Sequence, residues 1–338
     1  MDLNSCRLTE KDMSANKKQH FVPQLLQGFF SKDSKTIGCY HIASGKDYKS
    51  TISNTAQKDW LYRVNDADKT TIEHMYGHLE GNAKPIIVRL QNKDFDLSSD
   101  DIDKLFIFVV AQLMRTPKAA NAMKAVLDFC IEKKIEAVCR EVKAGIRDMS
   151  NLPMQATIAI PRVAEHLSGK SFLFIWNETG VNFLLADNPA CIISPVTELA
   201  AEKKIEDRMF RQEPFSGYML YMPLGPKVGI ICFDDDYYDF ESCPCIEATL
   251  HDVKTLNNLE IMNASDIIMH EEDSSCYEDI QKALEARKTE RWQRYQETIY
   301  TPIDVPFTLT GLNMDENVLV YKIHKYAVEK GGGAANKC

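Results

Sequence analysis

The chain has no surplus of positive charge and no long apolar run. Its 338 residues carry 40 Lys and Arg against 49 Asp and Glu, a formal net charge of −9. Because neutralising phosphates takes a concentrated basic face, this balance argues against a general nucleic-acid or anionic-membrane surface, although a local basic groove remains compatible with it. No uncharged apolar stretch approaches the roughly 18 residues that span a bilayer, and residues 1–18 lack signal-peptide character. We therefore expect a cytoplasmic protein with no membrane partner.

Several well-known catalytic sequence motifs are also missing. The chain has no Gly-rich phosphate loop, no Gly-x-Ser-x-Gly nucleophile elbow and no dinucleotide fingerprint, since Gly331–Gly333 does not follow a strand pattern. The ten cysteines are scattered through apolar surroundings and do not follow the spacing of a disulfide scaffold. We expect most of them to be buried free thiols.

Metal-ligand patterns are incomplete. His74 and His78 have the four-residue spacing that can chelate zinc on one helix face, but no third ligand can be named, so a surface or satisfied histidine pair is favoured. Cys243-Pro244-Cys245 is a Cys-x-Cys without a second pair, which favours a structural role. We therefore name no metal ligand, and a divalent metal cofactor is left open.

Apolar residues make up 44% of the chain, enough for a sizeable core. We find no repeats and no shift in composition that divides the sequence. The prediction is a flexible leader over residues 1–18, a single α+β domain over residues 19–328 and a flexible tail over residues 329–338. Within it, a helical N-terminal half is expected to pack on a mostly antiparallel sheet of hairpins.

Hydrophobic periodicity places the elements of this domain. Helices are predicted at 22–30, at 70–90 with a kink at Pro85, and over 100–143 with a break at Thr116-Pro117. Strands 172–176 and 182–186 are predicted to form one hairpin, and strands 218–222 and 228–233 a second. A strand at 37–42, helices at 247–263 and 277–295, and a strand at 266–270 between these helices complete the prediction.

The polar residues that could take part in binding or catalysis are dispersed along the sequence. Gln112 and Arg115 are three apart on a predicted helix and so face the same way, while Asp187-Asn188 closes an apolar strand. The guanidinium of an arginine and a side-chain amide, held on a rigid helix, can together bind a phosphate or a carboxylate. The structural alternative is that Arg115 holds Asp187 in place.

Five motifs in order carry a resemblance to a known family, and they are His20-Phe21-Val22-Pro23-Gln24, Glu80, Gln112-x-x-Arg115-Thr116-Pro117, Ala186-Asp187-Asn188-Pro189 and Pro223-Leu224-Gly225-Pro226. In this order and spacing the chain resembles the bacterial domain-of-unknown-function family 4238, over roughly residues 19 to 270. It differs in having Ala186 and Gly225 at positions where the family commonly has Ser. The resemblance implies candidate positions and no established activity.

The leading functional hypothesis is a hydrolase of a phosphate-containing substrate, in particular a nuclease of a bacterial defence or toxin type. The candidate catalytic residues are His20, Glu80 and Asp187, and the candidate substrate-binding residues are Gln112, Arg115 and Asn188. His20 has the residue type for general acid–base chemistry near neutral pH, and a carboxylate would orient it or hold a metal. The expected partner is nucleic acid or a small phosphorylated substrate.

Two readings from other functional classes remain open. The same residues suit a non-catalytic module that senses an anion or a protein, and a structural or interaction protein. An enzyme requires His20, Arg115 and Asp187 to meet at an accessible cleft, whereas a structural network requires them paired and sealed from solvent.

Overall fold

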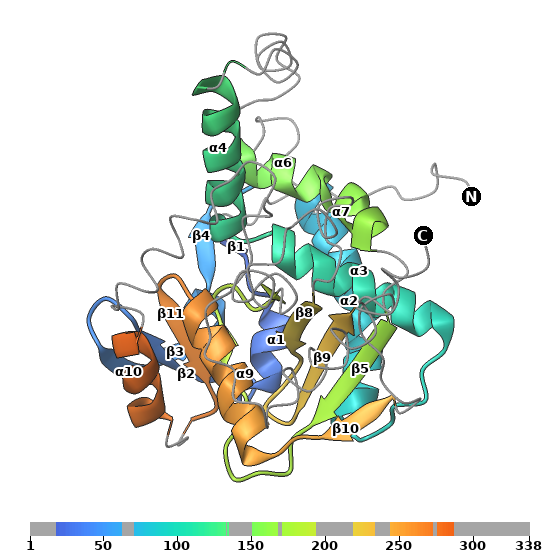
Figure 1. Ribbon diagram of the computed structural model, residues 1–338, viewed down its shortest axis with the longest axis vertical. Helices are drawn as coiled ribbons and strands as arrows, with labels where there is room; N and C mark the ends of the chain where they lie inside the picture. Colours follow the sequence, from blue (N-terminus) through green and yellow to red (C-terminus); the bar gives the residue numbers. More distant parts are fainter. Residues whose placement is uncertain are drawn as a thin grey trace, which may run out of the picture.

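The structure is a computed structural model that describes residues 18–62, 71–132, 134, 151–167, 171–193, 219–233, 244–272 and 276–286 (Figure 1). The predicted leader lies outside these residues except for Lys18, which begins the first strand. The predicted tail at 329–338 lies outside them entirely.

Where the structure describes the helical half, its α-helices are α1 (Gln24–Phe29), α2 (Thr71–Gln91), α3 (Ser99–Met114), α4 (Pro117–Glu132), α6 (Leu152–Ile158) and α7 (Ile160–Leu167). Ser98 and Asp101 form a capping box that starts α3. Pro117 starts α4, so the predicted break at Thr116-Pro117 is confirmed. The helix α2 continues through Pro85. None of the helices in the described part of the chain combines the length and apolar character needed to cross a bilayer.

A five-stranded sheet follows in the second half, in the order β10-β5-β9-β8-β7. Its strands are β5 (Ser171–Trp176), β7 (Cys191–Ile193), β8 (Met219–Pro223), β9 (Val228–Phe233) and β10 (Cys245–Glu247). Every neighbouring pair is antiparallel except β10 with β5. The predicted hairpin of β8 and β9 is confirmed, with Met219 paired to Phe233.

A four-stranded sheet in the order β3-β2-β11-β6 combines both halves of the chain. It contains β2 (Thr36–His41), β3 (Lys46–Thr51), β6 (Leu185–Ala186) and β11 (Ile267–His270). The predicted hairpin of residues 172–176 with 182–186 is wrong, because β6 pairs with β11 while β5 pairs with β9 and β10. A smaller pair joins β1 (Lys18–His20) to β4 (Gln57–Asp59), and a 3-10 turn, η2 (Ile52–Asn54), precedes β4.

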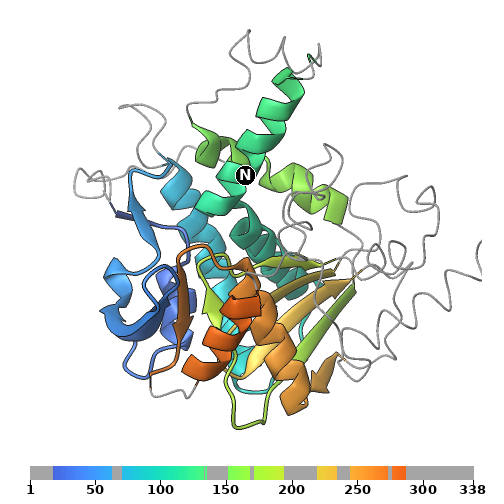
Figure 2. The same cartoon turned by 60° about the vertical axis from the view of Figure 1, so that its left-hand side comes forward.

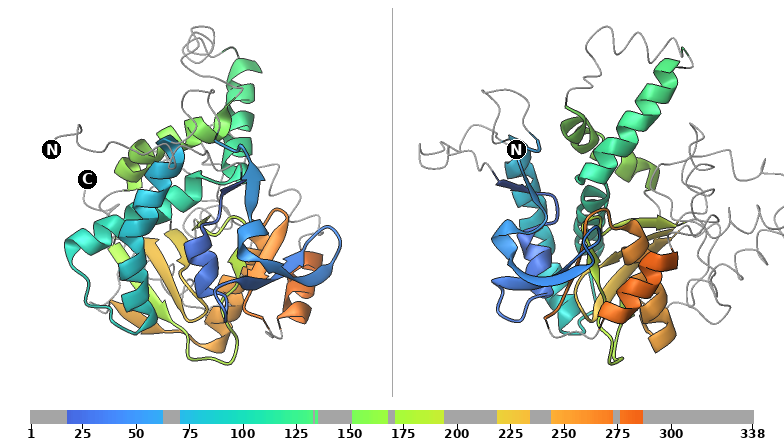
Figure 3. Two further views of the ribbon diagram at one scale, coloured as in Figure 1. Left: turned by 180° about the vertical axis from the view of Figure 1, so that it is seen from behind. Right: turned by 90° about the vertical axis from the view of Figure 1, so that its left-hand side faces the viewer.

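Helices cover both faces of the five-stranded sheet. The helix α9 (Leu250–Asn263) lies in front of it in Figure 1, and α2 and α3 lie behind it, as the reverse view in Figure 3 shows. The helix α10 (Tyr277–Ala286) runs beside α9 (Figure 2). The predicted helix at 277–295 is therefore confirmed as far as Ala286, and its remainder lies outside the described residues. The fold is α+β.

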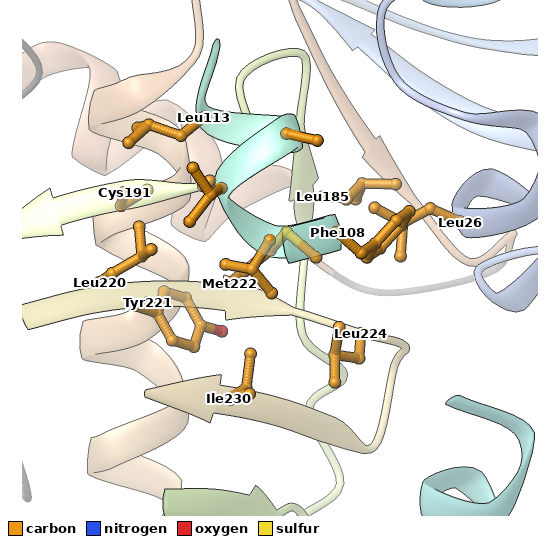
Figure 4. Close-up of a cluster of buried hydrophobic side chains, with 14 of the residues drawn as sticks. Leu26, Phe108, Leu113, Leu185, Cys191, Leu220, Tyr221, Met222, Leu224 and Ile230 are labelled. Carbon is orange, nitrogen blue, oxygen red and sulfur yellow. The ribbon is translucent and has the colours of Figure 1, made fainter. Parts of the chain in front are cut away.

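One hydrophobic cluster joins the helical half to the sheet. Phe108 and Leu113 of α3 belong to the same buried cluster as Leu220 and Met222 of β8, and Figure 4 shows all four. These four side chains are almost completely buried. Burying a side chain of this size stabilises the fold by about 1.5–3 kcal/mol. This packing fixes α3 relative to the sheet, and so it also fixes Arg115, the residue at the C-terminal end of α3.

In the four-stranded sheet, Gly38 lies close to the ring of His270, and this contact leads to a prediction about stability. A Cβ on Gly38 of β2 would lie 2.4 Å from Cε1 of His270, whose ring is buried and lies 2.9 Å from the Asp47 carboxylate. Gly38→Ala must displace this ring, so we expect a loss of about 1–3 kcal/mol in the free energy of unfolding. Urea denaturation measures it.

Gly28→Ala is the matched control, because a Cβ on Gly28 meets nothing within 4 Å and the residue lies in α1. Alanine there should leave stability unchanged or raise it by up to about 1 kcal/mol. Equal stability of the two variants would show that His270 does not confine Gly38.

Candidate functional site

Arg115 is the centre of a buried cluster that joins three elements. It closes α3, and its backbone N–H donates to the Ala111 carbonyl at 3.0 Å. Its side chain is 4% exposed, and its Nη1 lies 2.8 Å from Oε1 of Glu80 on α2. Its Nη2 donates to the backbone carbonyl of His20 on β1. The guanidinium also lies over the Tyr76 ring, 4.1 Å from its centroid, a cation–π contact.

Two tyrosines complete the wall of this cluster. The Tyr62 hydroxyl donates to the Arg115 carbonyl, and the Tyr62 and Tyr76 ring centroids are 5.3 Å apart. Burial raises the pKa of Tyr62 to about 12 and also raises that of Tyr76, so both phenols are neutral at physiological pH. Burial alone would lower the pKa of Arg115, but the charges of Tyr62 and Tyr76, which ionise only at high pH, and the Glu80 carboxylate outweigh it and raise the value. The guanidinium therefore stays charged.

His20 lies at the half-buried margin of the cluster. Nε2 of Gln24, the first residue of α1, lies 3.3 Å from Nδ1 of the imidazole. Burial lowers the pKa of His20, the backbone of Ile52 and Ser53 opposes this, and the Arg115 charge adds to the lowering. The imidazole is therefore neutral at physiological pH and able to accept a proton.

Glu73 is a carboxylate that the sequence did not indicate as a site residue. It lies two turns before Glu80 on α2 and so on the same face of that helix. Burial raises the pKa of Glu73, with the Arg115 charge opposing it and the Glu80 charge adding to it. The seven-residue spacing from Glu80 is the signal in the sequence that could have identified it.

Gln112 and Arg115 carry polar atoms that lack a hydrogen bond. Gln112 is 1% exposed, and neither its amide oxygen nor its amide nitrogen has a partner within the described part of the chain. The same holds for Nε of Arg115. A buried unpaired polar group costs about 1–3 kcal/mol. Because the two residues are three apart on α3, these unpaired donors face the same way.

Asp187 belongs to a second cluster, at the start of β11. Its carboxylate accepts from the backbone N–H groups of Ser265 and Asp266 at 2.7 Å each and of Ile267 at 3.2 Å. Burial raises the pKa of Asp187, and these three N–H groups oppose the shift. The structural alternative, in which Arg115 holds Asp187 in place, does not match the contacts, because Arg115 pairs with Glu80 and Asp187 binds backbone.

Asn188 connects this second cluster to α9 and α4. Its amide nitrogen donates to the Ser265 hydroxyl at 3.0 Å, and its backbone carbonyl accepts from Nδ2 of Asn263. Nζ of Lys118, at the start of α4, donates to Oδ1 of Asn263 at 2.6 Å. The Asn188 side chain is thus 5% exposed and engaged mainly with the protein itself.

Glu260 of α9 is the fully buried carboxyl of the second cluster. Its Oε2 accepts from the Ala186 N–H at 2.8 Å, and the Cys191 thiol lies 3.3 Å from its Oε1. Burial raises the pKa of Glu260 well above its ordinary value, although the Ala186 N–H, the Cys191 thiol and the Lys118 charge oppose this. Sequence reasoning missed Glu260, because it reads as one acidic residue of an amphipathic helix.

The six predicted site residues are therefore divided between two clusters. His20, Glu80 and Arg115 belong to the first, with Gln112 three residues before Arg115 on α3, and Asp187 and Asn188 belong to the second. The described contacts therefore do not bring Asp187 to His20 and Arg115, as the enzyme hypothesis required. Within the described residues, no hydrogen bond or ion pair joins the two sets. They are linked through the chain, since Lys118 follows Arg115 by three residues.

Residues 18–274 match the model of a family described as "Protein of unknown function (DUF4238)". The chain belongs to this family. No curated protein and no solved structure matches it significantly. The DUF4238 match begins at β1 and ends beyond β11, so it includes both clusters.

The position at which this chain departs from the usual DUF4238 pattern in the β8–β9 turn has a structural explanation. A Cβ on Gly225, where Ser is common, would lie 2.0 Å from Nε2 of Gln91, at the end of α2. That amide donates to the Leu224 carbonyl at 2.9 Å. In this member of the family, the Gln91 side chain occupies the space that a serine side chain would need.

The histidine pair and the Cys-x-Cys motif lie apart from both clusters. His74 and His78 are exposed on α2, and Nε2 of His78 lies 3.2 Å from Nδ2 of Asn82. Among the described residues, no group of three or more His, Cys, Asp or Glu side chains could hold a metal ion. Cys243 lies outside the described residues, and Cys245 of β10 is a half-buried free thiol.

The cysteines that the structure describes are free, as predicted. Cys39, Cys191, Cys232 and Cys276 are buried thiols. Burial raises the pKa of Cys39 to about 12 and also raises those of Cys191 and Cys232. These thiols are protonated and poorly reactive at physiological pH.

Glu260 yields a prediction about pH. Its raised pKa means that the folded state keeps this proton to higher pH than the unfolded state does. The resulting stabilisation is present below the unfolded pKa, about 4.3, and is lost as pH rises towards the folded pKa. Glu260→Gln cannot ionise, so the stability of the native protein relative to this variant should fall between pH 5 and 8. Thermal unfolding across that range measures it.

The control for this experiment is Glu278→Gln on the exposed surface of α10. Its unfolding temperature should follow that of the native protein at every pH. If the Glu260→Gln curve also ran parallel to the native curve, Glu260 would not carry a proton that the folded state retains.

Proposed function

We propose that this chain is a hydrolase that acts on a phosphate-containing substrate at the Arg115 cluster. The observation that carries the proposal is the set of unpaired donors at the end of α3, on Gln112 and on Nε of Arg115, whose guanidinium binds the backbone of His20, a residue with a neutral imidazole. Donors of this kind suit a phosphoryl oxygen, which accepts several hydrogen bonds and carries charge.

The roles follow from the state of each group. Neutral His20 accepts a proton from the attacking water as the new oxygen–phosphorus bond forms. Gln112 and Nε of Arg115 donate to a phosphoryl oxygen whose charge increases in the transition state. Glu73, whose raised pKa helps it to keep a proton, gives that proton to the leaving oxygen as the phosphorus–oxygen ester bond breaks. Glu80 positions Arg115 through their ion pair.

Asp187 and Asn188 have a supporting part in this proposal. The carboxylate of Asp187 is surrounded by three backbone N–H groups, so it is poorly placed to exchange protons with a substrate. We assign both residues to holding the turn between β6 and β7 against β11. The proposed reaction uses four of the six residues that the sequence indicates, together with Glu73.

The setting and the substrate are parts of the same proposal. Free buried thiols suit the reducing cytoplasm. A nuclease of a bacterial defence or toxin type is one form of the activity, and hydrolysis of a small phosphoester is the other. The net charge of −9 means that a nucleic acid would be bound locally at the site and not along a basic face.

A second candidate is a module that binds a phosphorylated ligand without turnover. The burial of Gln112 and Arg115 favours a role without turnover, because both residues are at most 4% exposed, as a structural network requires. Such a module would be stabilised against heat by phosphate or a phosphoester and would convert none of them.

The test is an activity panel with a His20→Ala variant. Purified protein is incubated with bis(p-nitrophenyl) phosphate, p-nitrophenyl phosphate and single- and double-stranded DNA and RNA, with and without Mg²⁺ or Mn²⁺. The native protein should hydrolyse at least one of these substrates. His20→Ala should lower the rate by about 10²–10⁴-fold, the range for losing a general base. Its unfolding temperature should stay close to that of the native protein, because Arg115 binds the backbone carbonyl of His20 and not the ring.

His78→Ala is the matched control, since His78 is an exposed histidine of α2, and it should keep the native rate. The rate of the native protein should rise with pH as His20 becomes neutral and fall again as Glu73 loses its proton, because the reaction needs His20 as a base and Glu73 as an acid. A rate unaffected by His20→Ala would overturn the assignment of the base. Stabilisation by phosphate with no turnover of any substrate would favour the binding module.

A further inference from the structure

A groove of about 280 Å³ lies between α9 and α10, away from the residues of both clusters. Both Figure 1 and Figure 2 show these two helices side by side. The segment before β6 closes its base. Within the described residues it is lined by Val181, Leu184, Lys254, Asn257, Asn258, Ile261, Cys276, Asp279, Lys282 and Ala283.

The base of the groove is apolar. Leu184 and Ile261 are almost fully buried, and Cys276 is 7% exposed. Val181 and Ala283 add two more apolar side chains. Asn257 is the polar residue of the base, and it is already satisfied: its Oδ1 accepts from the Leu184 N–H at 2.8 Å and its Nδ2 donates to the Asn182 carbonyl at 2.9 Å. A ligand therefore meets a hydrocarbon surface there.

The rim of the groove carries cations. Nζ of Lys254 lies 3.7 Å from Oδ2 of Asp279, a weak and half-exposed ion pair. Lys282 lies one turn after Asp279 on α10 and makes no ion pair with any residue that the structure describes. Two ammonium groups against one carboxylate leave the lining with a net charge of +1. Asn258, which also makes no hydrogen bond to another described side chain or backbone group, offers an amide beside them.

We propose that this groove binds a small amphipathic carboxylate, with its apolar body on Leu184, Ile261 and Ala283 and its carboxylate at Lys282 and Lys254. The net charge of +1 matches a monoanion, whereas a phosphate dianion would be left with excess charge over an apolar base. The volume equals that of about nine water molecules, which suits a small acid and not a peptide. Pockets of this kind combine apolar walls with a few polar groups that set orientation.

This site is independent of the proposed hydrolase. Its lining residues come from α9, α10 and the segment before β6, and none of them binds Arg115, His20, Glu80 or Asp187. Loss of binding here and loss of hydrolysis are therefore separable results.

The experiment is calorimetric titration of the full chain with sodium octanoate, 1-octanol and inorganic phosphate. Octanoate should bind with one site per chain and more tightly than 1-octanol, and phosphate should not compete with it. Lys282→Gln should weaken octanoate binding about tenfold or more, because one of the two cations that line the groove is removed. The exposed Lys84→Gln on α2 should bind octanoate as the native protein does.

A second variant tests the apolar base. Ala283→Phe fills the groove and should abolish binding, while circular dichroism checks that α10 remains folded. The proposal is overturned if octanoate does not bind, if Lys282→Gln binds it as tightly as the native protein, or if 1-octanol binds equally well. Competition by inorganic phosphate would likewise overturn the choice of a carboxylate.

Discussion

The N-terminal part of the fold depends on the interactions of one buried charge, the guanidinium of Arg115. Removing a charge from water costs several kcal/mol, and the structure compensates with the Glu80 carboxylate, the His20 carbonyl and the face of Tyr76. Each partner comes from outside α3, so the same contacts fix β1 and α2 relative to that helix. Because α3 packs on the five-stranded sheet through Phe108 and Leu113, the cluster is held against a rigid support.

Not every polar atom near Arg115 has a partner in the described part of the chain, and the atoms without one are those that we propose to bind the substrate. Arg115 uses Nη1 and Nη2, yet its Nε and the whole Gln112 amide remain buried and unpaired within the described residues. A purely structural network would satisfy these atoms or replace Gln112 with an apolar residue. The neutral imidazole of His20 and the carboxyl of Glu73 lie at the more open margin of the same cluster. The second cluster, around Asp187 and Glu260, differs because most of its polar atoms have partners inside the protein.

Local chemistry made part of this predictable. Thr116-Pro117 divides two helices because proline starts a helix readily and cannot continue one, and Pro223-Leu224-Gly225-Pro226 turns β8 into β9. The three-residue spacing of Gln112 and Arg115 was enough to place both on one face.

Sequence could not show which distant carboxylate meets Arg115, since Glu80 and Asp187 are equally suitable by type. It also could not show that β6 pairs with β11, because an apolar strand followed by a turn fits a hairpin equally well. Glu73 and Glu260 became candidates only through burial, which depends on tertiary packing.

The most direct measurement is the effect of Gln112→Met on both stability and hydrolysis. Methionine keeps the volume and removes the unpaired amide, so the free energy of unfolding should rise by about 1–3 kcal/mol while hydrolysis is lost. Gln27→Met is the control: Nε2 of Gln27 donates to the Val22 carbonyl at 2.8 Å and the Thr55 carbonyl at 3.2 Å, although its Oε1 is also unpaired within the described residues. Because the two hydrogen bonds are lost, stability should fall. A Gln112→Met protein that is less stable than the native one, or that hydrolyses at the native rate, would contradict the claim that Gln112 is held unpaired to bind a substrate oxygen.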